Sequence, residues 1–187
     1  MRKKWSVKKK ILVTLLSVIA AFLLVVIVYV LYVFGTYHRI KDKQPIEINS
    51  LNATEGSKVK TGVEYTAGTY NVGFGAYTPD YSFFMDGGKY SRCFSRQSGI
   101  DAINGAADYA KSENPDFMIF EEVDRDSTRS YHVNQENLIN KKFQGYFQNF
   151  AVNYDSAYLF YPFNEPIGKS YSGISVYSKY EITSALR

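Results

Sequence analysis

The sequence predicts an α/β domain of layered helices and sheet, preceded by one transmembrane helix. Three observations lead to this prediction. Residues 11–34 are apolar and carry no charge. Phe117–Phe120 is an apolar run too short for a helix, and it passes directly into acidic residues. Residues 63–72, rich in β-branched and aromatic side chains, and a helical period over residues 95–113 precede it, and the order strand, helix, strand is typical of a layered α/β fold.

The apolar segment Ile11–Phe34 has the length of a membrane span. At about 1.5 Å per residue it reaches roughly 36 Å, enough to cross a hydrocarbon core of about 30 Å. Residues 1–10 contain six Lys and Arg residues and no acid, more positive charge than follows the segment. This bias predicts a cytoplasmic head at residues 1–10, a single-pass anchor in the cell membrane and an extracytoplasmic domain. The alternative is a cleaved export signal, which would leave the domain outside but soluble.

Residues 35–62 lack an apolar period and are rich in polar side chains, which indicates a tether. The domain is therefore expected to occupy residues 63–187, with its first strand at Val63–Val72. Residues 73–92 are dense in glycine and aromatic residues and predict a long loop, within which Asp86-Gly87-Gly88 and Tyr90 are candidates for part of a substrate-facing lid.

An amphipathic helix is expected from about Ser95 to Glu113, ending before Asn114-Pro115. Phe117–Phe120 follows as a strand buried on both faces. The remaining expected elements are a short helix at 134–142 and strands at 146–154, 158–163 and 171–180. Acids stand where the buried strand ends, and ligand sites of layered α/β folds lie at such strand ends.

The charge balance makes nucleic acid a less favoured partner. The formal charge of +4 comes from the basic head, because residues 11–187 carry 16 Lys and Arg against 18 Asp and Glu. A domain that binds nucleic acid usually has a basic excess. Cys93 is the only cysteine, which excludes an intrachain disulfide framework.

Three motifs carry chemistry: TYNVGFG at 69–75, PDFMIFEEVD at 115–124 and YSGISVYSKYEI at 171–182. In this order and spacing they resemble the endonuclease/exonuclease/phosphatase superfamily of metal-dependent phosphoesterases. The resemblance implies that residues 63–187 form the N-terminal part of a four-layered α/β/β/α sandwich. It implies Mg²⁺ or Mn²⁺ as cofactor, with Glu122 as the metal ligand and Asn71 as the amide that orients the metal site and the scissile phosphate. Glu121 stands where the family has Gln.

The resemblance implies hydrolysis of a phosphomonoester or phosphodiester, with a phosphorylated small molecule or a lipid head group as the favoured substrate and nuclease activity as an alternative. The family's later pieces, an Asp-x-Asn motif and a closing Asp-His pair that supplies the general base, do not occur up to Arg187. This chain is therefore expected to show no turnover. The rival interpretations are a truncated, non-catalytic membrane protein or binding remnant, and an unrelated membrane-anchored binding domain.

Arg129 and His132 follow Glu122 by seven and ten residues in a polar loop. Arg129 could bind a phosphate oxygen and His132 could donate to a leaving group. The alternative is that both lie on a solvated loop.

Overall fold

The computed structural model describes residues 5–187, which divide into one unit ending at Tyr37 and a second formed by His38–Arg187. The first contains α1, Val7–Thr36, capped by Ser6, whose side chain accepts a hydrogen bond from the Lys9 backbone N–H. None of its residues is buried, and it is long and apolar enough to cross a membrane. The helix extends past the expected residues 11–34 at both ends, because the lysines before Ile11 continue the turn that Ser6 begins.

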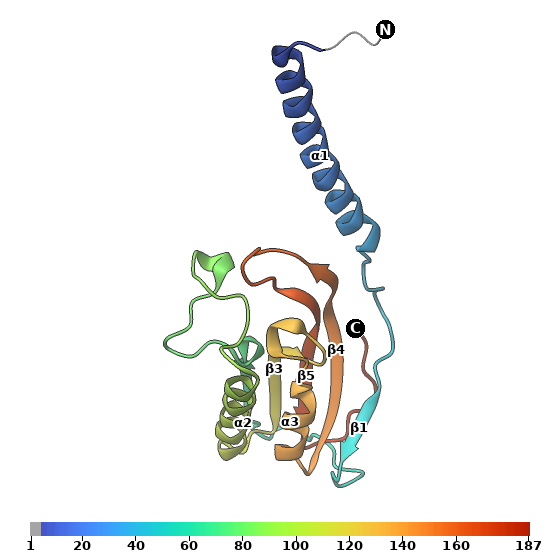
Figure 1. Ribbon diagram of the computed structural model, residues 1–187. Coiled ribbons are helices and arrows are strands. Elements are labelled where there is room, and N and C mark those ends of the chain that lie inside the picture. Colours follow the sequence, from blue (N-terminus) through green and yellow to red (C-terminus); the bar gives the residue numbers. More distant parts are fainter. Residues whose placement is uncertain (1–4) are drawn as a thin grey trace. The chain divides into compact units, whose positions relative to one another are not determined.

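The second unit is built on one five-stranded mixed sheet (Figure 1). Its strands are β1 (Ile48–Leu51), β2 (Ala67–Asn71), β3 (Phe117–Asp124), β4 (Tyr146–Leu159) and β5 (Gly168–Ser178). They lie in the order β1-β4-β5-β3-β2. The pair β2 and β3 is parallel, and the other pairs are antiparallel. The predicted α/β class is therefore confirmed.

Helices α2 (Arg96–Ser112) and α3 (Gln135–Lys142) pack on one face of this sheet. Ser95 and Ser98 form a capping box at the start of α2, and Asn134 caps α3. Both satisfy backbone N–H groups that have no partner within the helix. The core between helices and sheet contains Val72, Ile103, Ala107, Ala110, Met118, Phe120, Val123, Ile139, Phe143, Tyr146, Phe150 and Tyr177.

The expectation that Phe117–Phe120 is buried on both faces is wrong. Met118 and Phe120 are 4% and 0% exposed, whereas Ile119 between them is 38% exposed. Successive side chains of a strand point to opposite faces, and the helices cover only the face of Met118 and Phe120. On the other face, the rings of Tyr65 and Tyr180 pack against Phe117 at centroid distances of 6.1 and 5.7 Å.

Two further expectations need correction. Residues 35–62 are not a tether throughout, because Ile48–Leu51 forms the edge strand β1 against β4. Residues 146–159 form one strand where two were expected. Irregularities at Val152/Tyr154 and Ser156/Leu159 let β4 stay paired with β5 along this length. Non-local pairing decides both cases, and local sequence does not record it.

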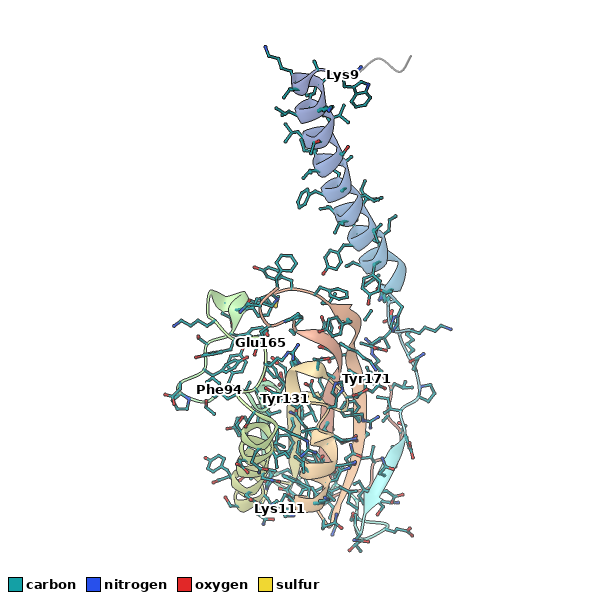
Figure 2. All side chains as sticks on the ribbon, in the orientation of Figure 1. Lys9, Phe94, Lys111, Tyr131, Glu165 and Tyr171 are labelled. Atoms are coloured by element: carbon teal, nitrogen blue, oxygen red, sulfur yellow. The ribbon has the colours of Figure 1, made fainter. Side chains whose placement is uncertain are left out.

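The glycine-rich and aromatic segment after β2 has its own small core. Phe74, Ala76, Tyr81 and Cys93 are buried there, with Phe83 and Tyr90 packed against them. Within residues 5–187 there are also three short 3-10 helices: η1 (Gly73–Gly75) and η2 (Phe84–Asp86) in this segment, and η3 (Thr128–Ser130) after β3. Figure 2 shows how densely side chains fill the globular unit, with Phe94 and Glu165 labelled near this segment.

Candidate functional site

A β-bulge in β3 determines where the acidic residues point. Phe120 pairs with Ser175 and Val123 pairs with Gly173, so Glu121 and Glu122 together oppose one residue of β5. Glu122 has φ = 55°, in the left-handed region. An extra residue of this kind re-aims the side chains around it. Without the bulge, Glu122 would share the core face with Phe120; with it, Val123 is the residue that returns to the core, 0% exposed.

Asn71 and Glu122 meet at the ends of the parallel strands β2 and β3. The Asn71 Nδ2 donates to Glu122 Oε1 at 2.9 Å, and the Asn71 Oδ1 accepts from the Gly73 backbone N–H at 2.9 Å. The amide is thus fixed in orientation by two bonds. The structure therefore brings together the two residues that the motifs single out.

Glu122 and Asn71 line a cavity of about 290 Å³, together with Gly73 and Tyr77. The phenol of Tyr77 donates to Asp86 at 3.4 Å. Tyr77 is 53% exposed, and the partial burial of its phenol, then the charges of Asp86 and Glu122, raises its pKa to about 12. Like any tyrosine of ordinary pKa, Tyr77 is an uncharged hydrogen-bond donor at physiological pH. Sequence reasoning missed this residue, because it lies in the glycine-rich loop outside every recognised motif.

Glu121, which replaces the Gln of the family motif, does not compete for the amide of Asn71. Its carboxylate accepts a hydrogen bond from Thr69 Oγ1 at 2.8 Å, and its backbone carbonyl accepts from the Val72 N–H. Glu121 therefore joins β3 to β2 beside the site.

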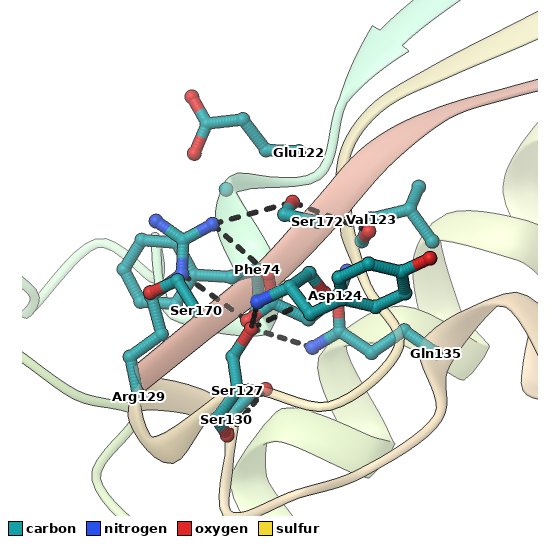
Figure 3. Close-up of polar contacts among 12 residues, drawn as sticks. Phe74, Glu122, Val123, Asp124, Ser127, Arg129, Ser130, Gln135, Ser170 and Ser172 are labelled. Atoms are coloured by element: carbon teal, nitrogen blue, oxygen red, sulfur yellow. Dashed lines mark hydrogen bonds and ion pairs between the residues drawn. The ribbon is translucent and has the colours of Figure 1, made fainter. Parts of the chain in front are cut away.

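Arg129 lies in a buried polar cluster and is only 7% exposed, so it is not on a solvated loop. Its guanidinium donates to both carboxylate oxygens of Asp124, at 3.1 and 2.9 Å, and stacks on the Phe74 ring at 4.1 Å (Figure 3). Burial acts to lower the pKa of Arg129, but Asp124 outweighs it and the pKa is raised. Glu122 adds a smaller contribution of the same sign. Arg129 thus lies near the site but is already bound to Asp124.

His132 lies apart from this cavity. Its Nδ1 is 2.6 Å from Asp126 Oδ1, and the same carboxylate accepts from Lys169 Nζ at 3.1 Å. First His132 and then Lys169 lower the pKa of Asp126. The side chain of His132 is 59% exposed, in agreement with the solvated-loop alternative.

The residues around the cavity fit a hard divalent cation that keeps most of its water. Within residues 5–187, no group of three His, Cys, Asp or Glu side chains is placed to hold a metal ion by itself. Mg²⁺ often takes only one or two carboxylates and completes its shell with water and substrate phosphate. Glu122 is partly exposed and stands outside the hydrogen-bonded cluster of Figure 3, so its carboxylate is available for that role.

Comparison with known proteins gives no match: no family model, no curated protein and no solved structure is significantly similar to this chain. The resemblance to the phosphoesterase superfamily therefore depends on the three sequence motifs.

Proposed function

We propose that this chain is a membrane-anchored, extracytoplasmic protein of the metal-dependent phosphoesterase type, in which Glu122 and Asn71 hold Mg²⁺ or Mn²⁺ for a phosphate ester. The observation that carries the proposal is the hydrogen bond between Asn71 and Glu122 beside a cavity, produced by the bulge in β3. A bulge that places two consecutive acids on one face costs backbone strain, and such strain collects at functional sites.

In this proposal, Glu122 provides the anionic ligand and Asn71 fixes the orientation of its carboxylate. A divalent cation stabilises the charge that develops on the phosphoryl oxygens and the leaving group. The phenol of Tyr77 is uncharged and can turn its one proton from Asp86 to a phosphate oxygen without repelling it. Residues 63–187 would belong to the first half of a four-layered sandwich.

The favoured ligand is a phosphorylated small molecule or a lipid head group. Residues 11–187 have a small acidic excess, which argues against a long polyanion such as nucleic acid. An anchor at α1 would also keep the site close to lipid head groups.

A non-catalytic role is the second candidate, and the positions of the histidines favour it for this chain. Hydrolysis needs a proton acceptor beside the attacking water. His132 is bound to Asp126 and His38 to Asp155, and neither lines the cavity of Glu122. We therefore expect the chain to bind metal and phosphate without releasing phosphate from model esters.

Mn²⁺ binding to the full chain in detergent, followed by electron paramagnetic resonance, tests the proposal. Glu122→Gln should abolish binding, and Asn71→Ala should weaken it by about tenfold or more, as for residues that orient a metal ligand. Glu121→Gln, which restores the family's residue, is the matched control and should retain binding. Equal affinity of wild type and Glu122→Gln would refute the site. Metal-dependent turnover lost in Glu122→Ala would instead refute the non-catalytic interpretation.

A further inference from the structure

Two loops at one end of the sheet expose large apolar side chains. We name this end the loop end; there β4 finishes at Leu159 and β5 begins at Gly168. Met85 of η2 is 71% exposed, and Tyr161 and Phe163 of the β4–β5 connection are 57% and 84% exposed. Aromatic residues and methionine this exposed usually mark an interaction surface when they form a patch.

The two loops are joined into one surface. The backbone N–H and the hydroxyl of Ser91 both donate to the Glu165 carboxylate, at 3.1 and 3.0 Å, and Arg92 Nε donates to the Pro166 carbonyl at 2.8 Å. The rings of Phe84 and Tyr161 lie 5.8 Å apart. The small aromatic core around Phe74 and Tyr81 packs beneath the first loop. The exposed side chains therefore sit on a supported structure.

The chain itself indicates what this surface meets. His38, the first residue of the globular unit, lies with its Nε2 3.1 Å from Asp155 on β4, four residues before the end of that strand. It directly follows the unit that contains the apolar helix α1. The Arg187 guanidinium also donates to the carbonyls of Ile40 and Lys41 at 3.2 Å, so the segment after His38 is held to the domain. The segment that connects α1 to the domain is therefore short and bound to the domain. Such a connection would hold the loop end at a high effective concentration near the bilayer in which α1 would be anchored.

We infer that Met85, Tyr161 and Phe163 form a second membrane contact, inserted into the interfacial region of the bilayer. Tyrosine is enriched at this depth, where an apolar ring and a polar tip are both satisfied, and phenylalanine and other apolar side chains reach the acyl boundary. The inference depends on the anchor of the proposed function but not on its metal site.

The contact would also orient the cavity of Glu122. Asp124 pairs with Ser172 near the start of β5, so β3 and its parallel neighbour β2 both end toward the loop end. Docking of Met85, Tyr161 and Phe163 would therefore place the cavity on the side of the domain that faces lipid head groups. This favours a head-group phosphate over a freely diffusing one.

Tryptophan reporters in the full chain test the contact. In a Trp5→Phe background, which removes the single native tryptophan, Phe163→Trp and Met85→Trp report on the two loops. The control is Tyr109→Trp, at a position that is 65% exposed on α2, near Lys111 at the opposite end of the sheet (Figure 2). Each protein is placed in nanodiscs with one copy per disc, containing lipids brominated on the acyl chains.

Both reporters should be quenched at least about twofold more strongly than the control, as expected for side chains about 5–10 Å below the head groups. Phe163→Asp should lower the quenching of the Met85→Trp reporter toward the control value. Quenching of either reporter no stronger than that of Tyr109→Trp would overturn the contact. A blue-shifted emission without quenching would also overturn it, because it would show protein in place of lipid. A chain that does not enter nanodiscs would overturn the anchor and this contact together.

Discussion

Two acidic residues at the end of β3, only two positions apart, lie in opposite environments. Asp124 is 0% exposed, and both of its oxygens accept hydrogen bonds from Arg129. Glu122 is partly exposed, accepts a hydrogen bond from Asn71 and lines a cavity. The same functional group therefore supports the fold at one position and faces an open cavity at the other, where the proposed function places a cation.

The difference arises from backbone geometry. The bulge at Glu121 and Glu122 directs Glu122 away from the core, and strand alternation resumes at Val123. A buried charge must be paired, since leaving it alone costs several kcal/mol. An exposed carboxylate has no such requirement and can exchange water for a cation. Substitutions at the two positions should therefore affect stability and ligand binding in opposite ways.

Arg129→Ala should produce the largest loss of stability. It leaves Asp124 buried without its partner and removes the stacking on Phe74, so the free energy of unfolding should fall by about 3–5 kcal/mol. Urea unfolding of the full chain in detergent, followed by near-ultraviolet circular dichroism, measures this. The control is the double variant Asp124→Leu, Arg129→Met, which removes both charges and should be closer to wild type. A loss below about 1 kcal/mol in Arg129→Ala would contradict the structural role of the pair.

Ser172→Ala should have a smaller effect in the same cluster. The Ser172 hydroxyl donates to the Val123 carbonyl at 3.2 Å and accepts from Arg129 Nη2 at 3.4 Å. The first of these hydrogen bonds is between neutral groups and the second is long, so their loss should lower the free energy of unfolding by about 0.5–1.5 kcal/mol. Ser82→Ala, which removes an exposed hydroxyl that accepts from the Lys89 N–H, is the matched control and should change stability by less than about 0.5 kcal/mol. Equal losses in the two variants would show that burial is not the cause.

Glu122→Gly should raise the free energy of unfolding, whereas the two preceding variants should lower it. Glu122 has φ = 55°, which costs a residue with a Cβ roughly 1–2 kcal/mol, and glycine avoids most of this cost. After the greater unfolded-state entropy of glycine is subtracted, the expected gain is about 0.5–1 kcal/mol. Glu122→Gln keeps the backbone cost and should stay within about 0.5 kcal/mol of wild type. Both variants should lose Mn²⁺ binding. A marked destabilisation by Glu122→Gly would show that the carboxylate supports the fold.

The sequence predicted the elements that local patterns define. The period of residues 95–113 located α2, and the apolar run before the acids located β3. Asn71 and Glu122 were predicted to converge, and their hydrogen bond shows that they do. The resemblance implied a common site for this pair, and the parallel pairing of β2 with β3 explains the contact, because such strands carry their ends to the same edge of a sheet.

The remaining features depend on contacts between distant segments. Ile48–Leu51 becomes a strand only because β4 offers a partner. Arg129 was expected to face a ligand or solvent. Its hydrogen bond to Asp124, which follows the bulge, instead holds it in a buried position. Tyr77 lines the cavity beside Glu122 because its ring packs on Phe74, at a centroid distance of 5.9 Å. None of these contacts has a local sequence signal.

The smallest expected effect concerns the phenol of Tyr77, which reports on the cavity without any assay of activity. Its pKa is raised to about 12 by burial first, then by Asp86 and by Glu122. Because the folded-state pKa lies above the unfolded value of about 10, the stability it contributes is present below about pH 10 and lost as pH rises toward 12. Nuclear magnetic resonance of ¹³Cζ-tyrosine, assigned with Tyr77→Phe, measures this pKa directly.

Asp86→Asn should lower the pKa of Tyr77 more than Glu122→Gln does, since Asp86 is the larger of the two charge effects. Both variants should leave the pKa above its ordinary value, because burial is unchanged. Mg²⁺ bound at Glu122 should also lower the pKa of Tyr77 in wild type, and should not do so in Glu122→Gln. If Mg²⁺ shifted this pKa equally in both proteins, the cation would bind elsewhere, and Glu122 would differ from Asp124 in exposure alone.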